Sequence, residues 1–310
     1  TSQVIRPLQP QTQTLYLIPT ASAPTGSVDR DAAGVKSHEC DDCNSLLPVL
    51  HHTSSHPSPQ QPSENEPTQR KPSPYIQRDS LTTLRRDGIQ IIQGYYTAEQ
   101  CAVLRAKIDA IIMSAGDAVD IDDQKSDHRV NGAERVSAEV AAFCDDPFTV
   151  DIARTLSDRE DLQRFTLAAR MEHKEGNKGS GGGWHRDSLG FQFKAMLYLS
   201  DVTMDNGPFQ FFRGSHRRFY KLRNYLFDLS QGFSDIVRYS DEHVSKLPQE
   251  DLITGTAKAG DLVLFNSSGV HRGMPTRGGV RYALTIYFFN EPWSESWEKQ
   301  LIQKPGTPKI

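Results

Sequence analysis

Hydrophobic and polar residues alternate along several short segments of the chain. The clearest is residues 191–199, Phe-Gln-Phe-Lys-Ala-Met-Leu-Tyr-Leu, and similar segments cover residues 163–173 and 282–289. Successive side chains of a strand point to opposite faces, so this period of two predicts β-strands. Residues 89–96 and the apolar segment 261–265 are expected to be strands as well. Many short strands separated by glycine and proline turns predict a mainly β domain, a sandwich or jelly roll.

Helical periodicity is strongest ahead of these strands. Thr97-Ala-Glu-Gln100 is a capping box, and it opens a helix expected to run to about Ser114 with apolar residues on one face. Further helices are expected at residues 81–88, 137–144, 147–157 and 217–230. Residues 116–132 are polar and irregular, which predicts a long loop that could fold over an active-site mouth. Residues 231–252 are expected to be an insertion.

Composition separates the start of the chain from the rest. Residues 1–74 hold 11 of the 18 prolines and one aromatic residue, Tyr16. Such a segment cannot bury enough apolar surface to offset its ordering entropy. We therefore predict a disordered, low-complexity tail over residues 1–74 and one folded domain over residues 75–310.

One motif in this tail resembles part of a zinc site. Cys40-Asp-Asp-Cys43 is a C-x-x-C, with His38 before it and His51, His52 and His56 after it. Structural zinc sites use four such ligands. The match is weak because no second C-x-x-C follows, and the alternative is a polar tail with incidental cysteines and histidines.

Charge and hydropathy exclude several classes of protein. The net charge of −4 gives no electrostatic reason to expect a nucleic-acid partner. The chain has no run of 18 apolar residues, so no membrane span is expected, and its start lacks the apolar region of a secretory signal. Four cysteines are few for 310 residues and suit a reducing compartment. We expect a cytoplasmic protein; the Ser/Thr-rich, acid-poor first 28 residues leave an organelle transit segment as the alternative.

The candidate chemistry begins in a glycine-rich segment, Gly181-Gly-Gly-Trp-His-Arg-Asp-Ser188. His185 and Asp187 are two residues apart, so in extended chain they share a face and can bind one metal ion from the same side. A third ligand from elsewhere would complete two histidines and one carboxylate, a set that leaves open positions on iron(II). His271, after the strand at 261–265, is the candidate. Arg281, ten residues later, can bind a carboxylate bidentately.

These motifs, in this order, resemble the phytanoyl-CoA dioxygenase family of iron(II)/2-oxoglutarate oxygenases. The segment Asp205-Asn-Gly-Pro-Phe-Gln-Phe-Phe-Arg-Gly-Ser-His216 is similar to that family's "NG…PGSH" element, with Phe212-Arg213 where the family usually has a residue and proline. The helix, Asp-Gly, strand and helix of the domain start are also similar. The resemblance covers roughly residues 81–289 and implies a double-stranded β-helix, a cupin-like jelly roll with flanking helices.

The resemblance also implies the cofactors and the site. Fe(II), 2-oxoglutarate as cosubstrate and O2 would be needed, with His185, Asp187 and His271 as metal ligands. Arg281 would bind the far carboxylate of 2-oxoglutarate. An Asp at position 187 favours hydroxylation, because related halogenases have a small residue there.

Several further residues have competing interpretations. The resemblance places Met196 where the family lines the 2-oxoglutarate site, and Arg170, on the strand before the motif, is a second candidate for that role; core packing or a structural ion pair is the alternative for both. His216 and His243 are rivals to His271 as third ligand, but neither has an arginine at the needed spacing on a strand. Arg277 is the alternative to Arg281, although only Arg281 opens a strand.

The substrate is the least defined part of the hypothesis. We predict hydroxylation of an unactivated C–H bond in a small molecule, with release of succinate and CO2. Nine basic residues flank the expected mouth, and some of them are expected to bind an anionic group such as a carboxylate, a phosphate or a CoA tail; the alternative is that most are solvated surface charges. They are Arg170, Lys174, Arg186, Lys194, Arg213, Arg217, Arg218, Arg272 and Arg277.

Two other classes of function stay open. One is a hydroxylase or demethylase of the same superfamily that acts on a protein or another macromolecule. The other is a non-catalytic jelly-roll binding module, which would require a damaged ligand set. The segment 206–216 favours the small-molecule branch, and oligomeric state is not addressed by the sequence.

Overall fold

The structure, a computed structural model, describes residues 74–230 and 237–303. All of these residues belong to one compact unit, Ser63–Ile310. Apart from Pro74, the predicted tail and its Cys40/Cys43 motif lie outside the described residues. The disorder predicted there therefore stays a prediction.

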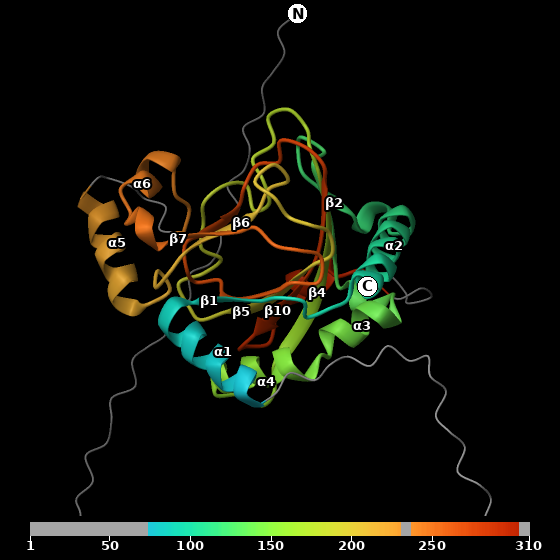
Figure 1. Cartoon of the computed structure of the whole chain (residues 1–310), viewed down its shortest axis with the longest axis horizontal. Coiled ribbons are helices and arrows are strands. Elements are labelled where there is room, and N and C mark those ends of the chain that lie inside the picture. The colour runs from blue at the N-terminus through green and yellow to red at the C-terminus, as the bar shows by residue number, and fades with distance from the viewer. Residues whose placement is uncertain (1–73, 231–236, 304–310) are drawn as a thin grey trace, which may run out of the picture. The chain divides into compact units, whose positions relative to one another are not determined.

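Two antiparallel sheets form the centre of the domain (Figure 1). The larger has seven strands in the order β1-β8-β5-β10-β4-β3-β2, and the smaller has three in the order β7-β6-β9. Their bounds are β1 Ile89–Ile92, β2 Asp120–Ile121, β3 Asp127–Asn131, β4 Gln163–Glu172, β5 Phe193–Tyr198, β6 Phe209–Phe212, β7 Leu252–Gly255, β8 Leu262–Asn266, β9 His271–Gly273 and β10 Val280–Phe289. The prediction of a mainly β jelly roll with flanking helices is confirmed.

The helices lie mainly on the side of the large sheet that faces away from the small one (Figure 1). Thr97 caps α2 as expected, because its hydroxyl accepts from the Gln100 backbone while the Gln100 side chain accepts from the Thr97 backbone. The helices are α1 Pro74–Asp87, α2 Ala98–Ser114, α3 Ala138–Cys144, α4 Pro147–Ser157, α5 Arg218–Ser230, α6 Asp241–Ser245 and α7 Glu295–Gln300, with short 3-10 helices at Gly116–Ala118, Ala133–Arg135 and Gln249–Asp251.

The two faces of the large sheet carry different residues. On β10, Leu284 and Ile286 join the apolar core under the helices, whereas Ala283 packs with Phe209 of the small sheet. Residues directly opposite each other on paired strands share a face, so the register also gives the faces of β5 residues. Met196 is opposite Thr285, and Lys194 is opposite Tyr287. Even-numbered positions of β10 therefore form the outer face, and odd-numbered positions face the space between the sheets.

The prediction of a long loop at residues 116–132 is wrong in part. The segment holds β2 and β3, and β3 pairs with β4 from Asp127 opposite Met171 to Asn131 opposite Leu167. Short strands with Asp, His, Arg and Asn lack an apolar alternation, so pairing with β4 decides their conformation rather than their own propensity. Similarly, part of the insertion expected at residues 231–252 is ordered as α6.

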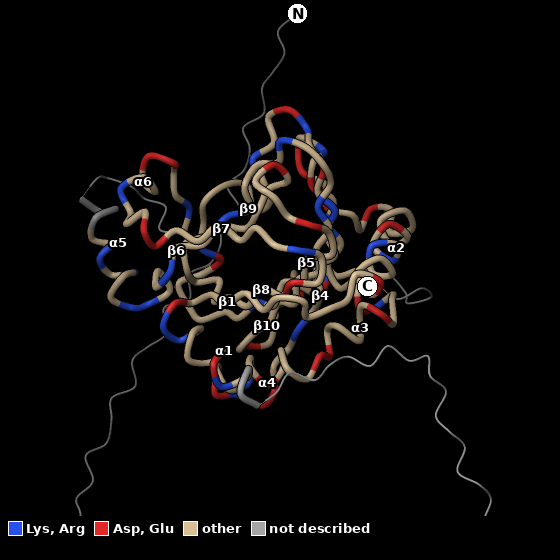
Figure 2. Tube along the Cα trace, viewed as in Figure 1, with Lys and Arg blue, Asp and Glu red and all other residues tan. Residues whose placement is uncertain are grey.

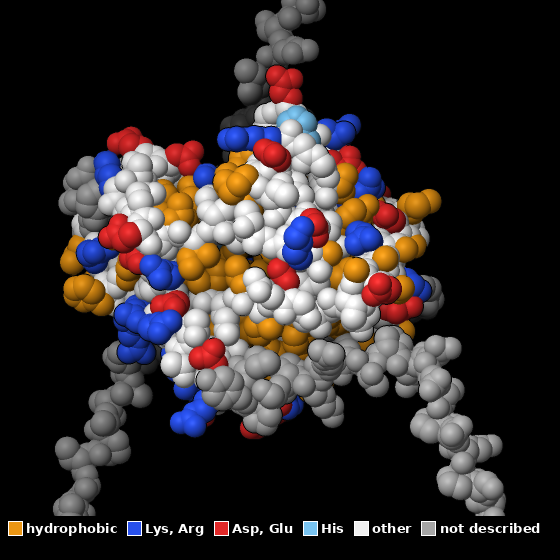
Figure 3. All heavy atoms as spheres, in the orientation of Figure 1, with side chains coloured by type: hydrophobic (Ala, Val, Ile, Leu, Met, Phe, Trp, Pro, Cys, Tyr) orange, Lys and Arg blue, Asp and Glu red, His pale blue; other side chains and the backbone are white. Residues whose placement is uncertain are grey.

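Charged residues of both signs are spread over the helices and loops (Figure 2). On the face drawn in Figure 3 they are interspersed with apolar side chains. Within residues 74–230 and 237–303, no helix combines the length and the hydropathy that crossing a bilayer requires.

The packing of α2 against the sheet can be tested by its contribution to the stability of the protein. Ile108 is fully buried between α2 and the outer face, whereas Met113 on the same helix is 87% exposed. We expect Ile108→Ala to lower the free energy of unfolding by about 2–5 kcal/mol, because it removes buried methyl groups and leaves a cavity. Met113→Ala is the matched control, and urea unfolding should show a change below about 0.5 kcal/mol for it. Equal effects of the two substitutions would contradict this packing.

Candidate metal centre

Backbone pairing brings His185 and His271 together from segments 86 positions apart. The His185 N–H donates to the His271 carbonyl at 2.9 Å, and the His271 N–H donates to the His185 carbonyl at 2.9 Å. His271 also begins β9, which pairs with β6. Two residues after His185, the Asp187 N–H donates to the Ser267 carbonyl at 3.1 Å. This bond holds the backbone of Asp187 in place. The two stretches are thus joined as a short antiparallel ladder, and the imidazole centroids are 4.3 Å apart.

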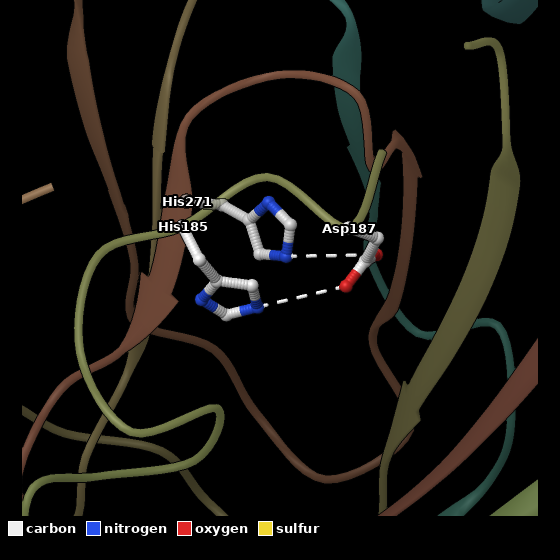
Figure 4. A group of neighbouring side chains, drawn as sticks. All are labelled: His185, Asp187 and His271. Atoms are coloured by element: carbon white, nitrogen blue, oxygen red, sulfur yellow. Dashed lines mark ion pairs between the residues drawn. The ribbon is translucent and has the colours of Figure 1, made fainter. Parts of the chain in front are cut away.

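Three side chains converge at this ladder (Figure 4). His185 Nε2 lies 3.6 Å from Asp187 Oδ1, and His271 Nε2 lies 3.9 Å from Asp187 Oδ2. One ligand atom from each residue lies within 4.8 Å of the others. In the part of the chain that the structure describes, this is the one cluster of three or more His, Cys, Asp or Glu residues with such spacing.

Both imidazoles are held in the tautomer that a metal ligand needs. His185 Nδ1 lies 2.8 Å from the Gly183 carbonyl, and His271 Nδ1 lies 2.9 Å from the Gly269 carbonyl. A carbonyl oxygen only accepts, so each Nδ1 carries the proton and donates. Nε2 is then the ring nitrogen available to a metal, and in both residues it faces Asp187, the arrangement in which a backbone carbonyl orients a metal-binding histidine. Two neutral nitrogen donors and one carboxylate fit a divalent first-row ion.

The glycine run before His185 has a specific steric role. Gly181 has a φ of +86°, and a Cβ there would lie 2.3 Å from His185 Cε1. A larger residue would therefore displace the imidazole as well as strain the backbone. This glycine allows the loop to pass directly over the ring.

Burial and neighbouring charges set the protonation of the site. Burial, followed by the neighbouring His185, lowers the pKa of His271 to about 3, so its imidazole is neutral at ordinary pH. Burial alone would raise the pKa of Asp187, but the Lys194 ammonium, the largest opposing influence, helps to hold that pKa well below its usual value. The site therefore presents an ionised Asp187 carboxylate beside a neutral His271 imidazole, the protonation states that metal binding requires of these two groups.

Arg281 is placed as a carboxylate anchor would be. Its side chain faces the space between the sheets and is 7% exposed. The guanidinium donates to the Gly207 carbonyl and contacts the Met171 sulfur at 3.5 Å. Among the described residues, no carboxylate lies within ion-pair distance of it. A buried arginine without a counter-charge is costly, so this position suits a ligand that supplies one. Arg277, the sequence alternative, is exposed in the loop before β10.

The structure places Met196 and Arg170 on opposite faces of the large sheet. Met196 is 8% exposed on the face toward the small sheet, the same face as Arg281. Arg170 lies on the helix side, where it pairs with Glu172 at 2.5 Å and Asp109 at 3.8 Å. This placement favours the structural ion pair, the alternative interpretation of Arg170, over a role in lining the cofactor site.

The two rival histidines lie outside the triad. His216 Nε2 is 3.3 Å from the Arg85 carbonyl, and a Cβ on Gly88 would clash with its ring. His243 belongs to α6 and packs edge-on against Tyr239, with ring centroids 4.8 Å apart. Neither joins the described metal-binding cluster.

Most of the nine basic residues expected around the mouth have structural partners. Arg186 is 2% exposed and donates to the Ser215 and Ser268 carbonyls, so it supports the loop behind the triad. Arg272 stacks on Trp184 with 4.3 Å to the ring centroid. Of the other members, Lys174 pairs with Glu172, Arg213 pairs with Asp251, and Arg217, Arg218 and Arg277 are exposed.

Lys194 differs from the other eight because it contacts the triad itself. Its Nζ lies 2.6 Å from Asp187 Oδ2, and the opposed charge of Asp187 outweighs burial to raise the pKa of Lys194. The sequence signal was a single lysine inside an otherwise apolar strand, but its partner was not apparent.

A second residue was missed altogether. Arg129 of β3 lies on the inner face, pairs with Asp127 and donates to the Ser180 hydroxyl at 3.1 Å. No sequence signal separated it from the polar loop expected there.

Comparison with known proteins defines the class of protein. The family model for phytanoyl-CoA dioxygenase (PhyH) matches residues 84–281. The chain belongs to the phytanoyl-CoA dioxygenase family. An ectoine dioxygenase from Nocardia farcinica is 27% identical over 237 residues, which cover 65% of this chain and 77% of that protein.

Solved structures share the fold at lower identity. The epimerase SnoN, in complex with Fe3+, alpha-ketoglutarate and nogalamycin RO, is 18% identical with a TM-score of 0.55, covering 77% of this chain and 93% of that one. EctD from S. alaskensis with bound Fe is 17% identical with a TM-score of 0.53, covering 68% and 75%. These likenesses support the jelly-roll architecture of the described domain.

The low pKa of His271 predicts how the stability of the metal-free protein depends on pH. In the unfolded chain this histidine takes up a proton near pH 6.5, whereas in the folded protein it does so only near pH 3. Stability is therefore lost as pH falls from 6.5 toward 3 and is unaffected by this group above 6.5. Between pH 7.5 and 5.0 we expect a loss of about 2 kcal/mol from His271. Urea unfolding with a chelator should show that His271→Asn reduces the loss by this amount; an unchanged pH dependence would contradict a neutral His271.

Proposed function

We propose that this protein is an Fe(II)- and 2-oxoglutarate-dependent dioxygenase that hydroxylates a small-molecule substrate. The convergence of His185, Asp187 and His271, with both Nε2 atoms facing the carboxylate, is the observation that carries the proposal. Membership of the phytanoyl-CoA dioxygenase family supports the reaction class. Iron and 2-oxoglutarate in structurally similar proteins support the choice of cofactors.

A bound metal ion and 2-oxoglutarate would together supply the oxidising chemistry, in which 2-oxoglutarate is converted to succinate and CO2, one atom of O2 enters succinate and the other enters the substrate. The chain's own residues bind and orient. His185, Asp187 and His271 would hold the ion from one side, which leaves the other side open. Arg281 would hold the far carboxylate of 2-oxoglutarate by paired hydrogen bonds.

The enclosure of the site supports the same function. His271 is 4% exposed, and the rings of Phe209 and Phe265 lie 5.5 and 5.6 Å from its imidazole. These aromatic walls exclude water from one side of the triad, and exclusion of water protects reactive species from side reactions. Asp187, with 23% of its side-chain surface exposed, lies on the more open side.

The substrate is proposed as a small molecule, with an anionic group as the first property to test. Arg217, Arg218 and Arg277 remain exposed as candidates for that group, whereas Lys194 and Arg186 are occupied. Succinate release should be measured with panels of acyl-CoA thioesters, amino acids and neutral metabolites. Turnover of neutral compounds beside uniform failure of charged ones would remove the anionic part of the proposal.

Loss of one imidazole should abolish the activity. We expect His271→Gln to lower Fe(II)-dependent succinate formation by about 100-fold or more, since a lost ligand should cost at least as much as a lost supporting residue. His128→Gln on β3 makes the same change outside the triad and should retain activity. Full activity of the His271 variant with added Fe(II) would exclude this metal centre.

A separate prediction concerns the binding of 2-oxoglutarate by Arg281. We expect Arg281→Lys to weaken 2-oxoglutarate binding by about 30-fold or more, because one paired hydrogen bond to a buried carboxylate is lost. Metal binding in the absence of 2-oxoglutarate should be unchanged. Arg277→Lys is the matched control, and a larger effect there than at position 281 would reassign the anchor. Isothermal titration of the anaerobic metal-loaded proteins measures both.

A further inference from the structure

Lys194 is an unusual cation because it lies inside the large sheet, directly under the candidate metal centre. Every residue of β5 is buried, and Lys194 itself is 4% exposed. Its Nζ lies 2.6 Å from Asp187 Oδ2 and 3.6 Å from the ring centroid of Tyr287. Among the described carboxylates, only Asp187 lies within ion-pair distance of it. The strand pairing of Lys194 with Tyr287 fixes both residues on the inner face.

The contact makes the two oxygens of Asp187 unequal. Both oxygens face an imidazole, because Oδ1 lies 3.6 Å from His185 Nε2 and Oδ2 lies 3.9 Å from His271 Nε2, but the ammonium contacts Oδ2. An ammonium that makes a short charge-assisted hydrogen bond to Oδ2 competes with a metal ion for that oxygen, so Oδ1 is the oxygen more available to a metal. The ring face of Tyr287 holds the ammonium from another side, as a cation–π contact does.

We propose that Lys194 is a positioning residue that restricts Asp187 to binding the metal through one oxygen, and so keeps a coordination position free for the reaction. The inference rests on the proposed function, because it concerns the same metal centre. A carboxylate that is released can bind a metal through both oxygens and occupy one of the positions that the two-histidine, one-carboxylate set leaves open.

Electrostatics shows that tighter metal binding cannot be the reason for this lysine. An ammonium group close to a divalent cation repels it, and the repulsion is strong where water is scarce. Burying an ammonium also carries a desolvation cost. The Lys194 contact thus lowers metal affinity while it orders the Asp187 carboxylate. An ordinary supporting residue differs, because its loss weakens metal binding.

The test compares Lys194→Met with the wild type and with Lys258→Met. Methionine keeps the length and apolar stem of lysine without its charge, and Lys258, which pairs with Asp201 on the surface, provides the same change of charge away from the site. Anaerobic titration with Co(II) reports affinity, and the visible absorption of bound Co(II) weakens as its coordination number rises. For Lys194→Met we expect Co(II) to bind at least as tightly as in the wild type, with weaker absorption, and Fe(II)-dependent 2-oxoglutarate turnover to fall by about tenfold or more. Lys258→Met should match the wild type in all three.

Other outcomes separate this inference from the function on which it rests. Weaker Co(II) binding with an unchanged absorption spectrum would overturn it and make Lys194 a packing residue only, and so would unchanged turnover. If Lys194→Met does not fold, Lys194→Gln, which keeps a hydrogen-bond donor but loses the charge, is measured in the same way and should show tighter Co(II) binding than the wild type. A wild-type protein that binds no Co(II) and consumes no 2-oxoglutarate would instead overturn the proposed function.

Discussion

The antiparallel pairing of His185 with His271 is the interaction on which the rest of the site depends. Two backbone hydrogen bonds, each 2.9 Å long, join the glycine-rich segment to β9. This pairing places two imidazoles side by side, and the extended chain that follows His185 returns Asp187 to the same face. Without it, the segment that carries His185 and Asp187 would not be joined to β9, and the pairing that places these side chains beside His271 would be lost.

The pairing is in turn supported from both sides by elements that cannot move easily. β9 is anchored by β6, whose residues are all buried, and the loop behind His185 is anchored by the buried Arg186 guanidinium. The large sheet provides the second wall, with helices packed over its outer face. Residues held on strands are positioned more precisely than residues on loops, which is what a site with fixed ligand distances requires.

The sequence predicted the class of fold and the residues that meet at the centre, because both depend on local patterns. Alternation identified β4, β5 and β10, and the His-x-Asp spacing identified two residues that share a face. Faces relative to other strands were not predictable, because they depend on register. Arg170 is directly opposite Tyr282, whereas its neighbour Met171 is opposite Arg281. A shift of one residue exchanges the two faces of a strand, so the sequence left both interpretations of Arg170 open.

The distribution of charge in the site indicates where a metal ion and an anionic cosubstrate would bind. The charge of Asp187 is already balanced by Lys194, and burial keeps the His271 imidazole neutral, before a metal arrives. Arg281, further along the same face, donates to a carbonyl and has no described carboxylate partner. A divalent ion adds two positive charges to that face. An anionic cosubstrate with a carboxylate at each end would then compensate the ion at one end and Arg281 at the other. Asp187 has a counter-charge in the protein, whereas Arg281 has no described carboxylate partner. This difference is consistent with a protein that binds a metal ion and a dicarboxylate.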